Sequence, residues 1–171
     1  MGVVKNGANG AAPVDAPQPL AANLAWLLSQ ASYALATQLT AALQDLGVSP
    51  RAHCVLSTAM TGELTQTELA HAVGLDKTTM VVTVDELEAA GLAERRPSKT
   101  DRRARVIAVT KAGARKVDQA TEVVERVQAE ALASLPPRER EAFLEALSCL
   151  VSGCASSAVE CSGVRRREPR A

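Results

Sequence analysis

The strongest constraint on the fold is a closely spaced series of helix start and stop signals between Thr65 and Gly91. Thr65 is followed three residues later by Glu68, a capping-box pattern that predicts the start of a short helix ending at Gly74. Asp76 predicts the N-cap of a second helix, which ends at Gly91. Two short helices joined by so tight a turn predict a helix-turn-helix.

The segment that follows the second helix is strongly basic. Residues 91–116 carry nine basic and two acidic side chains, although the whole chain has 19 of each sign and no net charge. Two β-prone runs, LAERRP and ARVIAV, flank the polar residues 98–101 and predict a hairpin. A charged hairpin can simply be a solvated edge that resists strand pairing. Directly after a helix-turn-helix it is typical of a wing, whose long cations reach the DNA backbone and the minor groove.

The second helix is expected to lie in the major groove of double-stranded DNA, with its N-terminus entering first. On a helical wheel its core face carries Met80, Val84 and Leu87, and Asp85 lies on the opposite face. The DNA-binding residues predicted on the two helices are Thr65, Gln66, Lys77, Thr78, Thr79, Val81 and Val82. Those predicted on the hairpin are Arg95, Arg96, Lys99, Asp101, Arg102, Arg103 and Arg105.

Long helical patterns flank this motif on both sides. Helices are expected over residues 20–46, 111–133 and 138–154, and because aromatic residues are only 2% of the chain, Ala, Val and Leu must form most of the core. The fold class is therefore mainly α with a small β-hairpin wing, a winged helix-turn-helix with long N- and C-terminal dimerisation helices. The expected parts are a disordered arm (1–19), a dimerisation region (20–48 and 111–157), a DNA-binding domain (49–110) and a flexible basic tail (158–171).

The segment LTQTELAHAVGLDKTTMVVTVDELEAAGLAERRPSKTDRRARVIAVTKAG closely resembles the MarR family of bacterial transcriptional regulators. The likeness is most specific at Asp101, Arg102 and Arg103 and at the run from Thr110 to Gly113. It implies a homodimer on a near-palindromic operator, usually as a repressor, in the bacterial cytoplasm. It also implies that Arg103 enters the minor groove with Asp101 as its salt-bridge partner. Where this chain has Val82 the family often has a polar residue, so the base readout here is expected to differ.

The resemblance further implies a small aromatic or phenolic effector that releases the DNA. Trp26 and Tyr33 are seven residues apart and share a helix face, and Arg51 and His53 begin the next helix, so these four are the candidate effector-binding residues. The alternatives are that Trp26 and Tyr33 belong to a core or dimer interface and that His53 is a partly buried structural histidine.

The remaining motifs favour neither a cofactor nor catalysis. Cys149, Cys154 and Cys161 have no nearby histidine and poor zinc spacing, and Cys54 is expected to be buried and inert beside Val55 and Leu56. No phosphate-binding loop or hydrolase motif is present, so we expect no enzyme, no metal and no cofactor. The uncharged residues 16–44 are interrupted by polar side chains in an amphipathic pattern, which argues against a membrane helix. A thiol-oxidation sensor of the same fold and a protein-binding adaptor with a degenerate winged helix remain alternatives.

Overall fold

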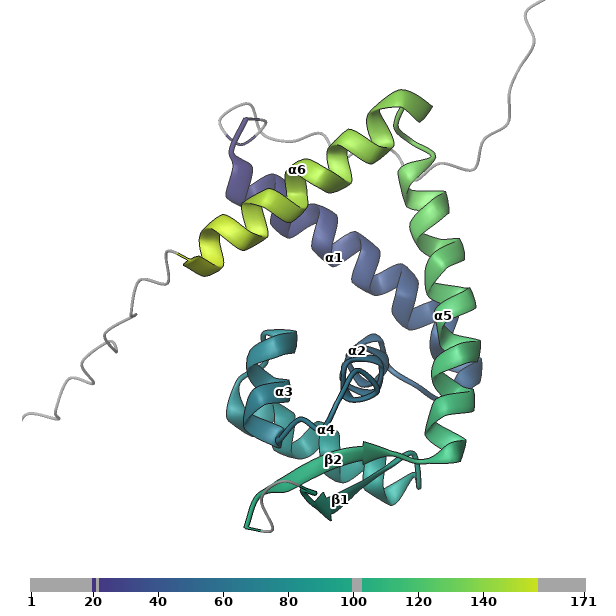
Figure 1. The fold of residues 1–171 in the computed structure, drawn as a ribbon. Coiled ribbons are helices and arrows are strands. Elements are labelled where there is room, and N and C mark those ends of the chain that lie inside the picture. The colour runs from purple at the N-terminus through teal and green to yellow at the C-terminus, as the bar shows by residue number, and fades with distance from the viewer. Residues whose placement is uncertain (1–19, 21, 100–102, 157–171) are drawn as a thin grey trace, which may run out of the picture. The chain divides into compact units, whose positions relative to one another are not determined.

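A computed structural model describes residue 20 and residues 22–99 and 103–156 of the 171-residue chain, and of residues 154–156 only the backbone. It divides into two compact units, one up to Gln128 and one from Ala129 onward. The predicted arm (1–19), the tail (158–171) and wing residues 100–102 lie outside the described residues. Figure 1 shows the elements in chain order: α1 (Leu24–Leu43), the 3₁₀ turn η1 (Gln44–Leu46), α2 (Pro50–Ala59), α3 (Gln66–Val73), α4 (Lys77–Ala89), β1 (Ala93–Pro97), β2 (Arg105–Val109), α5 (Lys111–Leu132) and α6 (Pro137–Ser156).

Side-chain caps start the helices of the central motif where the sequence predicts them. The Thr65 hydroxyl accepts from the Glu68 N–H at 3.3 Å, and Glu68 accepts in return from the Thr65 N–H at 2.8 Å. The Asp76 carboxylate accepts from the Thr79 N–H at 2.9 Å and so begins α4. Gly74, at φ 68°, ends α3 in the left-handed region that glycine adopts without strain. The predicted helix-turn-helix is therefore confirmed.

The first long helix begins later than its apolar pattern predicts. Asn23 accepts from the Trp26 N–H at 2.9 Å, and this cap starts α1 at Leu24 rather than at residue 20. At the other end the α-helix tightens into η1 and stops at Gly47, whose φ is 63°. The expected helix end at Gly47 is confirmed. The N-cap at Asn23 was not predicted, because the apolar helical pattern in the sequence begins before this residue.

The predicted hairpin is present and has an additional neighbour. Strands β1 and β2 pair antiparallel, with Arg95 opposite Ile107. The loop between α2 and α3 runs beside β2: the Ile107 N–H donates to the Leu64 carbonyl at 3.0 Å, and Thr65 forms an isolated bridge with Val106. A single bridged residue pair is too short to show the alternation of apolar and polar residues that marks a strand, so the sequence did not indicate this contact.

The core of the first unit lies between the helix-turn-helix and the hairpin. As the wheel predicts, Met80, Val84 and Leu87 are buried, and they pack with residues of α2, α3 and β2. Thr83 is buried too, because its hydroxyl donates to the Thr79 carbonyl at 2.8 Å and leaves no unpaired donor in the core. A helical wheel that only separates polar from apolar residues does not predict the burial of Thr83.

Helices α1 and α6 each keep apolar side chains on the surface of their own unit. On α1 the exposed ones are Leu24, Leu27, Leu28 and Tyr33, and on α6 they are Phe143, Leu144, Leu150 and Val151. Within the described residues, none of the helices combines the length and hydropathy needed to cross a membrane.

Candidate nucleic-acid interface

Helix α4 presents a short, mostly uncharged surface to solvent. Thr78 is exposed, Val82 is 49% exposed and Val81 is half-buried. Lys77 is exposed in the first turn, where the unpaired N–H groups of the helix start and an ammonium favour an anion such as phosphate. The surface can therefore meet a phosphate at the helix N-terminus and apolar base edges one turn later.

Two predicted helix-terminal residues already have partners within the chain. The Thr79 N–H and hydroxyl both donate to the Asp76 carboxylate, and these bonds lower the pKa of Asp76. The Thr65 hydroxyl is held by Glu68, whose pKa the N–H of Thr65 lowers most. Both threonines hold the helix starts in place, which is a positioning role for the surface around them.

Arg95 differs most from its expected role as a phosphate contact. Its guanidinium donates to Asp85 at 2.7 Å, to the Gln66 amide oxygen at 3.2 Å and to Glu88, and its side chain is 29% exposed. Burial works to lower the pKa of Arg95, but Asp85 and Glu88 outweigh it and raise that pKa. In the described structure Arg95 therefore neutralises the acidic end of α4. Its position among six other cations in the sequence did not indicate this role, and its predicted contact with DNA stays a prediction.

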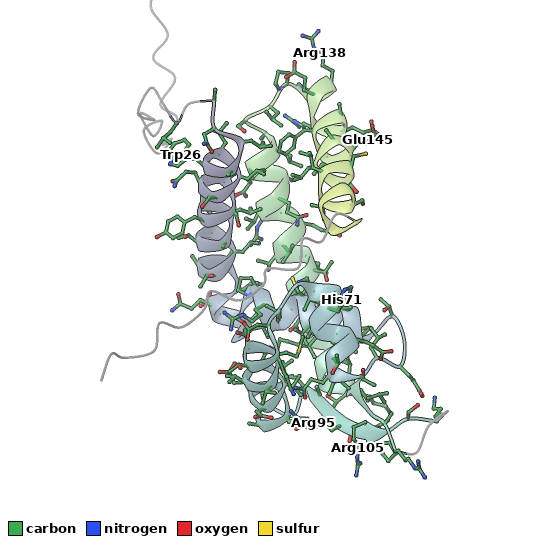
Figure 2. The ribbon with its side chains drawn as sticks, turned by 90° about the vertical axis from the view of Figure 1, so that its left-hand side faces the viewer. Trp26, His71, Arg95, Arg105, Arg138 and Glu145 are labelled. Carbon is green, nitrogen blue, oxygen red and sulfur yellow. The ribbon has the colours of Figure 1, made fainter. Side chains whose placement is uncertain are left out.

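The other described wing cations extend from the hairpin. Arg105 and Arg103 are exposed, and Figure 2 shows Arg105 projecting from the end of the hairpin. Arg96 is exposed and pairs with Glu94 on its own strand. The Lys99 side chain is 89% exposed and its ammonium lies 3.3 Å from Glu63. Asp101 and Arg102 lie outside the described residues, so the expected pairing of Asp101 with Arg103 stays a prediction.

Comparison with known proteins agrees with this arrangement. The model of the MarR family matches residues 46–104, which contain α2, α3, α4 and β1 and end just before β2. CouR from Rhodococcus jostii, in its complex with p-coumaroyl-CoA, is 26% identical, with a TM-score of 0.73, 87% of this chain covered and 100% of CouR. Residues 46–104 therefore match the model of the MarR family, and the chain resembles solved structures such as CouR over most of its length.

Two further structures show what has been seen bound to similar proteins. A structure of the transcriptional repressor CouR on a 23-mer DNA duplex is 25% identical, with a TM-score of 0.68, over 75% of this chain and 92% of that one. The Rv2887 protein of Mycobacterium tuberculosis, in complex with salicylic acid, is 27% identical, with a TM-score of 0.64, over 80% of this chain and 98% of that one.

The four candidate effector residues lie on α1 and α2 and differ in their exposure. Tyr33 is 74% exposed and borders a shallow hollow formed by α1 and η1 residues alone, whereas Trp26 is half-buried and Arg51 is exposed. His53 is half-buried, and its Nε2 lies 3.1 Å from the Thr121 hydroxyl and 3.3 Å from the Ser57 hydroxyl. Burial lowers the pKa of His53. The effector assignment of these residues stays a prediction.

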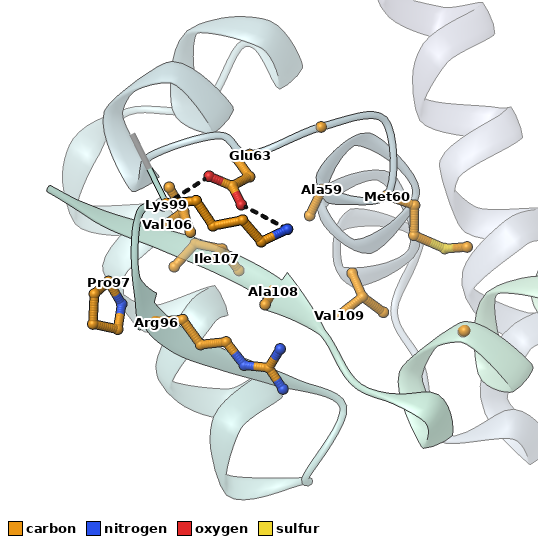
Figure 3. Close-up of a pocket in the computed structure, with 12 residues that line it drawn as sticks. Ala59, Met60, Glu63, Arg96, Pro97, Lys99, Val106, Ile107, Ala108 and Val109 are labelled. Atoms are coloured by element: carbon orange, nitrogen blue, oxygen red, sulfur yellow. Dashed lines mark hydrogen bonds and ion pairs between the residues drawn. The ribbon is translucent and has the colours of Figure 1, made fainter. Parts of the chain in front are cut away.

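Another groove was not expected from the sequence. It has a volume of about 370 Å³ and lies between the end of α2, the hairpin and the start of α5, as Figure 3 shows. Its floor includes Ile107 and Val109, and Glu63 and Lys99 meet at its edge. Glu63 therefore belongs to the wing surface, although neither the charge pattern nor the residue spacing in the sequence predicted this.

The expectation that Cys54 is buried is wrong. Cys54 is an exposed free thiol, while its neighbours Val55 and Leu56 are fully buried. Successive residues of a helix point about 100° apart, so the two apolar side chains occupy the core face and turn Cys54 away from it. Cys149 is also an exposed free thiol.

Proposed function

We propose that this chain is a sequence-specific DNA-binding transcriptional repressor of the MarR family that acts as a homodimer on a near-palindromic operator. The observation that carries the proposal is that the exposed face of α4 and the cationic wing belong to one compact unit with a shared core. A structure of the relative CouR on duplex DNA supports the same use of the fold.

In the proposed complex α4 enters the major groove by its N-terminus. Lys77 and the first-turn N–H groups meet phosphate, Thr78 reaches a base edge, and Val81 and Val82 contact thymine methyl groups. The wing follows the backbone into the minor groove, where a narrow groove attracts arginine. Its proposed cations are Arg96, Lys99, Arg102, Arg103 and Arg105, with Asp101 orienting Arg103.

The exposed apolar side chains of α1 and α6 support dimerisation. Leu24, Leu27 and Leu28 on one helix, and Phe143 and Leu144 on the other, are exposed in the isolated chain, and burying such groups against a second copy is favourable. A two-fold dimer places two α4 helices about one DNA turn apart, so its operator repeats in inverted form.

We further propose that a small aromatic or phenolic effector releases the DNA. Structures of relatives with p-coumaroyl-CoA and with salicylic acid support this class of molecule. Trp26, Tyr33, Arg51 and His53 remain the proposed contacts, because an aromatic pair and a cation suit an aromatic anion. The exposure of Cys54 favours one second candidate, release on oxidation of this thiol.

The test is fluorescence anisotropy of the purified protein on DNA from directly upstream of its own gene, over a salt series. With about three phosphate contacts per wing, log K falls with log salt at a slope of roughly −5. A saturable complex that resists random competitor DNA supports the proposal. Binding no tighter than to random DNA contradicts it for that site and favours the adaptor. Phenolic acids and peroxide, added to wild type and to Cys54→Ser, distinguish the two release mechanisms.

A further inference from the structure

The loop between α2 and α3 brings one carboxylate to the wing. Leu64 and Thr65 lie beside β2 through the Ile107 N–H bond to the Leu64 carbonyl, 3.0 Å, and the bridge from Thr65 to Val106. The residue just before them is Glu63, whose side chain is 37% exposed. Its backbone is thus held next to a strand that is far away in the sequence.

The Glu63 carboxylate binds the last described residues on the β1 side of the wing tip. Oε2 accepts from the Lys99 N–H at 3.1 Å and from the Ser98 hydroxyl at 3.3 Å, and Oε1 lies 3.3 Å from the Lys99 ammonium. Figure 3 shows the two contacts between Glu63 and Lys99. We call the three residues Glu63, Ser98 and Lys99 the Glu63 clasp. Ser98 is 7% exposed, and its own N–H donates to the Ala104 carbonyl at 3.0 Å. The clasp therefore fixes both sides of the tip.

The charge of Glu63 has the wrong sign for a surface that attracts DNA. The Lys99 N–H, the Lys99 ammonium and the Ser98 hydroxyl lower the pKa of Glu63, so the carboxylate is ionised at neutral pH. A negative charge beside the wing repels phosphate and partly neutralises Lys99. Electrostatics alone predicts that removing this carboxylate strengthens DNA binding.

We propose that Glu63 is a positioning residue for DNA binding: before DNA arrives it holds Ser98 and Lys99 in place and so presents the described wing cations. This inference rests on the proposed function. Holding Ser98 and Lys99 in the free protein removes an entropic cost that binding would otherwise carry. That gain outweighs the repulsion between one carboxylate and phosphate.

Glu94 provides a matched control. It carries the same charge as Glu63, lies on the hairpin that Glu63 contacts and is similarly exposed at 44%. Its described ion pair is with Arg96, two residues along its own strand. It does not bind the tip to another element through that pair. Glu94→Ala therefore removes a wing carboxylate without releasing the clasp.

The experiment compares wild type, Glu63→Ala and Glu94→Ala by anisotropy on the upstream duplex and on a random duplex of equal length. We expect Glu63→Ala to bind about tenfold more weakly and Glu94→Ala to bind equally or up to a few-fold more tightly. In an Arg103→Ala/Arg105→Ala background, Glu63→Ala has little further effect, because the cations it positions are gone. Binding by Glu63→Ala at least as tight as wild type overturns the inference, as does a full additional loss in that background.

Amide exchange in the free protein tests the clasp without DNA. We expect the Lys99 N–H of Glu63→Ala to exchange about tenfold faster than in wild type, with core amides such as Leu69 unchanged. An unchanged Lys99 rate overturns the inference. If wild type binds neither duplex, the proposed function fails, and the exchange measurement alone decides whether Glu63 orders the tip.

Discussion

Arg95 binds the Glu88 carboxylate with both its backbone N–H and its guanidinium. The Arg95 N–H donates to Glu88 Oε1 at 2.7 Å, and the Arg95 guanidinium donates to Glu88 Oε2. Glu88 lies in the last turn of α4 and Arg95 lies in β1, so the pair joins the helix proposed to enter the major groove to the first strand of the wing. The acidic side chains at the end of α4 therefore form contacts within the protein.

Replacing Arg95 should reduce stability. Arg95→Ala leaves Asp85 and Glu88 without their cation and Gln66 without its donor, and we expect the free energy of unfolding to fall by about 1–2 kcal/mol. Urea denaturation measures it. Arg96→Ala is the control: its exposed pair with Glu94 should change stability by less than about 0.5 kcal/mol. Equal effects of the two substitutions would contradict a role for Arg95 in joining α4 to the wing.

Removing the two acidic partners of Arg95 separates positioning from simple attraction. The Asp85→Asn/Glu88→Gln variant has two fewer negative charges near the proposed interface, so electrostatics alone predicts tighter DNA binding. We expect weaker binding, by about three- to tenfold, because α4 and β1 lose their connection. Anisotropy at one salt concentration distinguishes an increase in DNA affinity from a decrease. A gain in affinity would show that Arg95 contacts phosphate once it is released.

Arg105 should determine part of the salt dependence. Arg105→Ala removes one phosphate contact per wing, and the slope of log K against log salt should become shallower by about 2 for a dimer. Arg138 is an exposed arginine on α6, outside the proposed interface, and Arg138→Ala should leave the slope unchanged. An unchanged slope for Arg105→Ala would exclude that residue from the phosphate contacts.

Local signals in the sequence predicted the winged helix-turn-helix well. The caps at Thr65 and Asp76 and the turn at Gly74 act over three or four residues, so a single sequence reveals them. The role of Arg95 and the position of Glu63 depend on partners 7 to 36 residues away, which only the packed structure brings together. The exposure of Cys54 was mispredicted for a related reason, because which side of α2 is buried depends on the elements packed against it.

The pKa of His53 predicts a loss of stability in mild acid. Burial lowers this pKa in the folded state, so the unfolded chain binds a proton more readily. Stability therefore falls as the pH drops through the unfolded value near 6.5 and levels off below the folded pKa. The lowered pKa values of Glu63, Glu68 and Asp76 act in a lower pH window. Their stabilisation is lost as the pH falls below the unfolded values, 4.5 for the two glutamates and 3.8 for Asp76, and through their folded values.

Thermal unfolding between pH 5 and 7.5 tests this assignment with His53→Gln. Glutamine can still hydrogen-bond the Thr121 and Ser57 hydroxyls but does not titrate, so the decline between pH 7 and 5 should become smaller. His71 is exposed on α3, and His71→Gln serves as the matched control that should keep the wild-type decline. Identical pH profiles for wild type and His53→Gln would assign the decline to another group.

Gly113 should be the least replaceable residue at the junction between the wing and α5. A Cβ at this position would lie 2.0 Å from the Leu92 carbonyl oxygen and 2.8 Å from Val109 Cγ1. The same carbonyl accepts from the Thr110 N–H at 3.0 Å, and the Thr110 hydroxyl accepts from the Gly113 N–H at the start of α5. A shift to relieve the clash therefore breaks the bond that holds this capping residue to Leu92. We expect Gly113→Ala to cost about 2–4 kcal/mol of unfolding free energy.

Gly153 on α6 is the matched control, because a Cβ there meets nothing within 4 Å. Alanine is the better helix former, so Gly153→Ala should be neutral or stabilise the protein by up to about 1 kcal/mol. In urea denaturation, the free energy of unfolding should therefore fall clearly for Gly113→Ala and stay unchanged or rise for Gly153→Ala. A Gly113→Ala protein as stable as wild type would mean that Leu92 and the start of α5 can move apart without losing the Thr110 bond.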